Sequence, residues 1–187
     1  MKEEILKAVE VLRKGGVILY PTDTVWGIGC DATNEEAVKR IYDIKHRDDS
    51  KSLVLLASDM DMICRYVKEV PEMAIQLVEV NDQPMTIIYP GAQGLAQNVT
   101  ADDGSVGIRI PMMDFCRQLA ARLGRPVVST SANISGAPTP KVYSEIPQEI
   151  KDAVDHITDP SLERGATGKS SSIIKVGLDY SIEIIRK

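Results

Sequence analysis

Hydroxyl side chains gather in Ser129-Thr-Ser-Ala-Asn-Ile-Ser-Gly136, directly after the short apolar run Pro126-Val127-Val128. If the chain stays extended there, Ser129 and Ser131 share one face of a strand and Thr130 lies on the other, because side chains alternate. Two hydroxyls, a carboxamide and a flexible turn would then hold a polar ligand without introducing charge. The alternative is a serine-rich turn that caps the next element.

Cationic side chains are concentrated at the end of a predicted helix. Lys45, Arg47 and Lys51 fall within seven residues and could hold a polyphosphate. The alternative is a favourable placement of cations at a helix C-terminus, together with solvated charge.

A single arginine lies in an otherwise apolar predicted strand, Ser105-Val-Gly-Ile-Arg109-Ile-Pro111. Alternation places Arg109 on the same face as Ser105 and Gly107. The planar guanidinium could clamp a carboxylate or a phosphate. An arginine exposed on an open sheet face is the alternative.

The segment Pro21-Thr-Asp-Thr24-Val-Trp26-Gly-Ile-Gly-Cys30 brings two hydroxyls, a carboxylate and two glycines into a predicted turn. The glycines permit close backbone approach, to a ligand or to another strand. Trp26 could line a pocket wall. The alternative is a local turn with Trp26 in the core.

Other catalytic motifs are not found in the sequence. Gly168-Lys169-Ser170 resembles the end of a P-loop, but the required earlier glycine is missing and a strand is expected to follow. Neither of the two histidines lies in a nucleophile motif. No cluster predicts a metal site. The polar inventory therefore suits binding a phosphorylated ligand and stabilising charge more than proton abstraction.

The composition predicts one compact α/β domain over residues 1–187, with a largely aliphatic core. The net charge of −5 argues against a stand-alone nucleic-acid binder. The three cysteines are expected to be buried apolar residues in a reducing compartment. The charged N-terminus and the absence of a long apolar run predict a cytoplasmic protein with no membrane partner.

Hydrophobic periodicity predicts alternating helices and strands, hence an α/β fold whose late, short strands favour a mixed sheet. Helices are expected at 3–14, from 34 to about 45, and at 59–67, 71–80 and 114–123. Strands are expected at 17–20, 53–57, 85–89, 105–110, 126–130, 154–158, 171–176 and 181–186. Residues 134–147 read as a surface loop.

Taken in order, these segments resemble the YrdC-like family, the threonylcarbamoyl-AMP synthases. The matching blocks are Tyr20-Pro-Thr-Asp-Thr24 with Trp26-Gly27, Lys45-x-Arg47, Ser105 to Pro111, Ser129 to Gly136, and Ser171-Ser172 with Ile184-Ile185-Arg186. The resemblance implies a twisted open mixed sheet flanked by helices, with a concave basic cleft. The short, single-domain form of the family is expected.

The resemblance implies a reaction that joins L-threonine, bicarbonate and ATP into threonylcarbamoyl-AMP, with Mg²⁺ sharing the charge neutralisation. It assigns threonine contacts to Thr24, Arg109, Ser129 and Ser171. It assigns Lys45 and Arg47 to catalysis and, with Lys51, to the ATP phosphates. It places Ser105, Ser131, Asn133, Thr139 and Arg186 on the nucleotide side. The nucleophile comes from the substrate, so positioning and electrostatics supply most of the acceleration.

Two segments depart from the family pattern. Asn81-Asp-Gln-Pro-Met-Thr86 replaces a Trp-Pro-Gly-Pro turn, and Leu56 stands where many members have a polar residue. Both bear on the selectivity for threonine.

Two other functions are compatible with these residues, although each has an observation against it. One is a non-catalytic module of the YrdC/YciO type that binds double-stranded RNA, tRNA or ribosomal RNA; the acidic net charge weighs against it. The other is a carbamoyl-phosphate-using domain like those of hydrogenase maturation factors, which occur in long multidomain chains. For the enzyme, tRNA is an indirect partner, and contact with later tRNA-modification enzymes is left open.

Overall fold

The computed structural model describes residues 1–47 and 53–187. Its α-helices are α1 Lys2–Arg13, α2 Glu35–Lys45, α3 Met60–Tyr66, α4 Glu72–Val80, α5 Asp114–Leu123 and α6 Gln148–Ala153. Three short 3₁₀ helices are η1 Gln97–Val99, η2 Tyr143–Glu145 and η3 Pro160–Leu162. The strands are β1 Ile18–Tyr20, β2 Gly27–Gly29, β3 Val54–Leu56, β4 Met85–Tyr89, β5 Val106–Arg109, β6 Val127–Ser131, β7 His156–Ile157, β8 Ser172–Val176 and β9 Ile182–Arg186.

In the described part of the chain, nine strands form one sheet in the order β7-β1-β2-β6-β3-β5-β4-β8-β9. The pairs β1–β7, β3–β5 and β4–β8 are parallel, and the remaining neighbours are antiparallel. The predicted mixed sheet is therefore confirmed. The strands β5 and β6, which carry two of the predicted polar segments, lie on either side of β3 in the centre of the sheet.

Local sequence signals set the helix boundaries near the site. Asn34 caps α2, because its side chain accepts a hydrogen bond from the Ala37 amide (3.0 Å). The helix ends at His46, which adopts a left-handed conformation with φ 50°. Such a residue stops the helix and turns the chain sharply. Lys45 and Arg47 therefore leave the helix at its C-terminus, as the sequence predicts.

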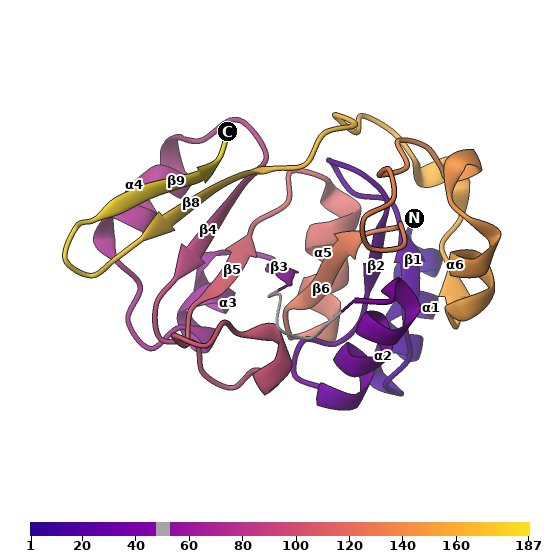
Figure 1. Cartoon of the computed structure of the whole chain (residues 1–187), viewed down its shortest axis with the longest axis horizontal. Helices are drawn as coiled ribbons and strands as arrows, with labels where there is room; N and C mark the ends of the chain where they lie inside the picture. Colours follow the sequence, from indigo (N-terminus) through magenta and orange to yellow (C-terminus); the bar gives the residue numbers. More distant parts are fainter. Residues whose placement is uncertain (48–52) are drawn as a thin grey trace.

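The helices cover the sheet with apolar faces. Helix α1 buries Ile5, Ala8, Val9 and Leu12, and it packs against α5, which buries Phe115, Cys116 and Leu119. The core is largely aliphatic but includes the fully buried rings of Trp26, Tyr20, Tyr89 and Phe115. In Figure 1, α1 and α6 lie at one end of the molecule, and the β8–β9 hairpin with α4 lies at the other.

Strand β2 is the main element that the sequence reading missed, since its segment was predicted as a turn. It contains two glycines in three residues, a composition that disfavours a strand. The tertiary structure requires glycine here, because a Cβ on Gly29 would lie only 2.4 Å from the Val128 carbonyl oxygen. Helix α6 was also missed; it is only six residues long.

The three cysteines differ in their exposure. Cys30 and Cys116 are buried as expected, but Cys64 is exposed, so the expectation was wrong for that residue. It lies on the outer side of the short helix α3, whose buried face is formed by Met62 and Ile63.

None of the helices within residues 1–47 and 53–187 combines the length and apolarity that a membrane crossing requires.

Candidate active site

A hollow of about 310 Å³ is lined by the starts of β2 and β3 and by the ends of β5 and β6. Guanidinium and hydroxyl groups dominate its polar lining, and the described lining contains no carboxylate. The lining residues are Thr24, Val25, Trp26, Gly27, Arg47, Leu53, Val54, Arg109, Ser129, Thr130, Ser131, Ser170, Ser171, Ile173 and Arg186. Thr130 also contributes to the lining, which simple alternation along β6 did not predict.

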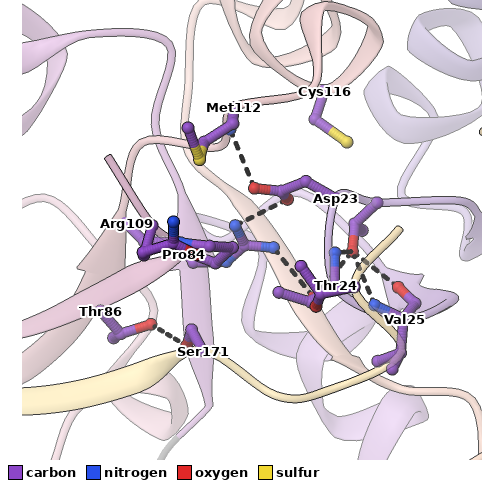
Figure 2. A network of polar contacts seen from close by, with 12 residues as sticks. Asp23, Thr24, Val25, Pro84, Thr86, Arg109, Met112, Cys116 and Ser171 are labelled. Carbon is purple, nitrogen blue, oxygen red and sulfur yellow. Dashed lines mark hydrogen bonds and ion pairs between the residues drawn. The ribbon is translucent and has the colours of Figure 1, made fainter. Parts of the chain in front are cut away.

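Arg109, at the end of β5, is held by the turn that follows β1. Its Nη1 donates to Asp23 Oδ1 (2.7 Å) and its Nη2 donates to the Thr24 hydroxyl (3.2 Å). Figure 2 shows both contacts, with Met112 on the other side of the Asp23 carboxylate. Arg109 is only 4% exposed, so this ion pair is shielded from water. The guanidinium therefore has a fixed orientation at the wall of the hollow.

The turn after β1 is itself built by Thr22. Its hydroxyl donates to the Val25 carbonyl oxygen (2.6 Å) and accepts from the amides of Thr24 and Val25 (3.1 and 3.3 Å). This local network is the threonine turn that was an alternative for the segment. The turn also leaves Thr24 and Trp26 on the lining of the hollow.

Lys45 lies behind the described lining rather than in it. Its ammonium donates to three oxygens: the carbonyl oxygen of Ser131, the carbonyl oxygen of Asn133 (2.8 Å) and the Asn133 carboxamide oxygen (3.3 Å). An ammonium has three N–H donors, so all of them have a protein acceptor. Burial, followed by the charge of Arg47, lowers the pKa of Lys45 to about 8. Lys45 therefore holds the end of β6 in place.

Asn133 completes the turn that follows β6. Its carboxamide oxygen accepts from Ser131 Oγ as well as from Lys45, and its Nδ2 donates to the carbonyl oxygens of Ile134 (3.2 Å) and Ala137 (2.8 Å). The Ser135 amide donates to the Lys45 carbonyl oxygen (2.8 Å), which ties this loop to the end of α2. The Lys-x-Arg and Ser-x-Asn segments thus meet in space.

Arg47, just after α2, and Arg186, at the end of β9, both line the hollow. Burial lowers the pKa of both guanidinium groups, and an arginine remains charged at such sites. The Arg186 Nε donates to the Ser171 carbonyl oxygen (2.8 Å). The Ser171 hydroxyl lies 2.8 Å from the Thr86 hydroxyl, so Ser171 is fixed from both sides (Figure 2).

The segment between η3 and β8, residues 163–171, connects the two ends of the molecule (Figure 1). The amides of Thr167 and Gly168 donate to the carbonyl oxygens of Asp23 and Thr24 (both 2.9 Å). Glu163 accepts hydrogen bonds from the Trp26 indole and from the Tyr143 amide. These contacts bring Ser170 and Ser171 to the lining.

A second hollow of about 580 Å³ adjoins the first and shares Leu53, Val54 and Ile173 with it. Its lining is mixed: aliphatic side chains stand beside the polar and charged residues Thr86, Asp102, Asp103, Ser105, Lys175 and Glu183. Ser105 lines this second hollow, and its hydroxyl donates a hydrogen bond to Asp103 Oδ1 (2.5 Å).

Not every predicted residue can be assigned to one of these two linings. Thr139 is exposed in the loop after β6 and lines neither hollow. Lys51 lies outside the described residues. Leu56 is completely buried in β3 and lines neither hollow either, so the apolar residue at that position belongs to the core.

The sequence reading assigned no role to Asp23, although it noted the carboxylate in the turn. A signal was available: Arg109 lies in a buried, apolar strand and requires a counter-charge. Glu163 was also missed, because nothing in the sequence links it to Trp26 across 137 positions.

Fold and site together define an α/β protein with a mixed sheet and a hollow in which guanidinium and hydroxyl groups converge from six separate segments. A family model described as telomere recombination, covering the Sua5, YciO and YrdC proteins, matches residues 10–187. The chain belongs to this Sua5/YciO/YrdC family.

Individual relatives agree with this assignment. The threonylcarbamoyl-AMP synthase of Idiomarina loihiensis is 33% identical over 151 residues, which cover 79% of this chain and 81% of the relative. The structure of P. abyssi Sua5 complexed with L-threonine matches with a TM-score of 0.86 and 27% identity, over 94% of this chain. This chain spans 52% of that Sua5 chain. E. coli YciO matches with a TM-score of 0.86 and 27% identity, over all of this chain and 90% of YciO.

Proposed function

We propose that this protein is a threonylcarbamoyl-AMP synthase, which joins L-threonine, bicarbonate and ATP and releases pyrophosphate and water. One observation carries the proposal: three arginines and the Ser129, Ser131 and Ser171 hydroxyls converge on one hollow, although they come from distant segments. The name of the Idiomarina loihiensis relative and the threonine complex of P. abyssi Sua5 support the same substrate class.

Threonine would bind next to Arg109. Its carboxylate would accept N–H bonds from the guanidinium, whose orientation Asp23 and Thr24 fix. Ser129 and Ser171 would bind its remaining polar groups. Trp26, Val25 and Val54 supply the apolar part of the same wall, which suits the threonine methyl group.

The chemistry would proceed in two bond-forming steps. The threonine amine forms a C–N bond with bicarbonate, and water leaves, which gives a carbamate. A carbamate oxygen then attacks the α-phosphorus of ATP, the bond to the β-phosphate bridging oxygen breaks, and pyrophosphate leaves. No protein nucleophile is needed. Arg47 and Arg186 would neutralise the charge that develops on the phosphates.

Lys45 would act mainly by positioning Ser131 and Asn133, because its three donors are engaged with their oxygens. The second hollow would receive the nucleoside, with Ser105 on its lining. Within the described residues, no group of three or more acidic, histidine or cysteine side chains could hold a metal ion. Mg²⁺ would therefore enter with ATP, held by phosphate oxygens and water.

We further propose that residues 1–187 act as one domain, which the continuous sheet supports. The product would serve the modification of a tRNA adenosine, so tRNA and the later modifying enzymes would be downstream of this site. The alternative function, which the similarity to YciO suggests, is a non-catalytic RNA-binding module.

The decisive experiment incubates the purified protein with threonine, bicarbonate and ATP, and detects threonylcarbamoyl-AMP by mass spectrometry and pyrophosphate by a coupled assay. We expect both products, and neither when threonine or bicarbonate is omitted. Arg47→Ala should abolish most of the signal, and Arg65→Ala, a matched change on the exposed side of α3, should leave it intact. Absence of product at saturating substrate, together with tight RNA binding, would support the binding module.

A further inference from the structure

Asp23 connects three segments of the site through one buried carboxylate. Its Oδ1 accepts from Arg109 Nη1 (2.7 Å), and its Oδ2 accepts from the Met112 amide (2.9 Å). The side chains of Arg109 and Asp23 are 3% and 8% exposed. The turn after β1, the end of β5 and the start of the connection to α5 are therefore locked to one another (Figure 2).

Asp23 also contacts the segment 163–171, which contributes Ser170 and Ser171 to the lining of the hollow. Its backbone carbonyl oxygen accepts from the Thr167 amide (2.9 Å), next to the bond from Gly168 to Thr24. The side chain orients Arg109, and the backbone holds the segment that carries Ser170 and Ser171. Arg109 and the segment with Ser170 and Ser171 are therefore both held by Asp23.

The charge balance explains why a carboxylate is needed here. A buried guanidinium without a partner pays a large desolvation cost, and a partner oxygen also fixes its plane. Arginine has five N–H donors. Asp23 accepts one of them, from Nη1, and Thr24 accepts another, from Nη2. The remaining donors belong to the same planar group, so these two contacts also fix their direction.

We propose that Asp23 is a positioning residue for threonine recognition, which holds the Arg109 guanidinium in the plane that receives the substrate carboxylate. This inference rests on the proposed function, since it names the residue that determines how that site binds its amino acid. Asp23 does not line the hollow, and Arg109 is the lining residue that its carboxylate binds. Its loss should affect threonine and leave ATP largely unaffected.

The test compares Asp23→Asn with Asp31→Asn. Asp31 is a matched control, because it is also a buried aspartate with an arginine at 2.7 Å, but its partner Arg125 lies outside both hollows. We expect Asp23→Asn to raise the KM for threonine about tenfold to a hundredfold, the value of a charge-assisted contact. The KM for ATP should stay within about twofold. Asp31→Asn should change neither constant, although both variants lose stability.

A double-mutant cycle with Arg109→Gln separates positioning from general damage. If Asp23 acts through Arg109, Asp23→Asn should add little to the threonine KM once the guanidinium is gone. Equal losses for threonine and ATP, full additivity, or the same effect from Asp31→Asn would overturn the proposal.

Folding and function can be separated in the same series. Asp23→Ser, which leaves room for water, serves if Asp23→Asn does not fold; failure of both to fold would make Asp23 a purely structural residue and overturn the inference. Threonine binding by calorimetry gives a readout without turnover. A wild-type protein that neither binds threonine nor forms product would remove the proposed function itself. A wild type that does both, matched by Asp23→Asn, would remove only this inference.

Discussion

Asn133 binds the Lys45 ammonium twice, through its backbone carbonyl oxygen at 2.8 Å and its carboxamide oxygen at 3.3 Å. The two residues are 88 positions apart. This contact joins the C-terminus of α2 to the turn after β6, and with Ser131 it occupies every donor of the lysine. The cation is therefore part of the framework behind the hollow.

Replacing this cation should damage both the fold and the use of ATP. Lys45→Met leaves three oxygens without their donor, so we expect the free energy of unfolding to fall by about 3 kcal/mol. The kcat/KM for ATP should fall about tenfold or more. Denaturant unfolding and steady-state kinetics measure the two effects. Lys39→Met, on the exposed side of the same helix, is the control and should change neither.

Replacing Arg109 and replacing Arg47 should each impair the use of a different substrate. Arg109→Gln should raise the KM for threonine, and Arg47→Gln should raise the KM for ATP. Each change removes a charge-assisted contact of roughly 1.5–3 kcal/mol. Initial rates with one substrate varied at a time measure the split. Wild-type constants in either variant would remove that arginine from its role.

The lowered pKa of Lys45 predicts a pH dependence of ATP binding. Below about pH 8, the ammonium is charged in both the folded and the unfolded chain. Between about 8 and the ordinary value of 10.5, the folded chain loses the proton first. The unfolded chain then binds more protons, so this group's contribution to the free energy of unfolding rises with pH. ATP affinity should fall over the same range, since the neutral amine has one N–H donor fewer with which to hold Ser131 and Asn133 in place.

Calorimetric titration with a non-hydrolysable ATP analogue from pH 7 to about pH 9.5 tests this dependence. Lys45→Arg keeps the charge and should remove most of the decline. An affinity that is constant across this range in the wild type would argue against a titrating Lys45.

Glu163 should control the environment of Trp26, which is the only tryptophan in the chain. The carboxylate accepts from the indole and from the Tyr143 amide, and the Trp26 and Tyr143 rings lie 5.2 Å apart. Glu163→Ala leaves two donors unpaired, so we expect a loss of about 1–3 kcal/mol in stability and a shift of tryptophan fluorescence to longer wavelength. Glu145→Ala, at an exposed glutamate that binds only the Lys141 amide among the described contacts, should leave the emission unchanged.

The two glycines of β2 should respond differently to alanine. At Gly29 the new methyl group would lie 2.4 Å from a backbone oxygen, so Gly29→Ala should destabilise the protein by about 3 kcal/mol or more. At Gly27 the methyl group would lie 3.1 Å from Ser129 Oγ, in the hollow. Gly27→Ala should therefore cost less stability and impair threonine use more. Thermal melting and kinetics on both variants measure the difference, and the reverse order would contradict the assignment of this wall.

The sequence by itself determined the elements with a regular apolar period. Helix α5 and strand β4 begin and end at the predicted residues, because buried faces repeat with the period of a helix or a strand. It also placed Arg47, Arg109 and the Ser129–Ser131 segment at the ends of elements, where polar side chains have to leave the core.

Only the tertiary structure decided which of these ends meet. Strand β2 exists because β1 and β6 pair with it on both sides, and no local preference of Gly27–Gly29 favours it. The Asp23–Arg109 ion pair spans 86 positions and depends on the order of strands in the sheet, which a linear pattern does not contain. The sequence supplies the charged groups; the packing of the sheet decides which of them are paired within the protein and which line the hollow.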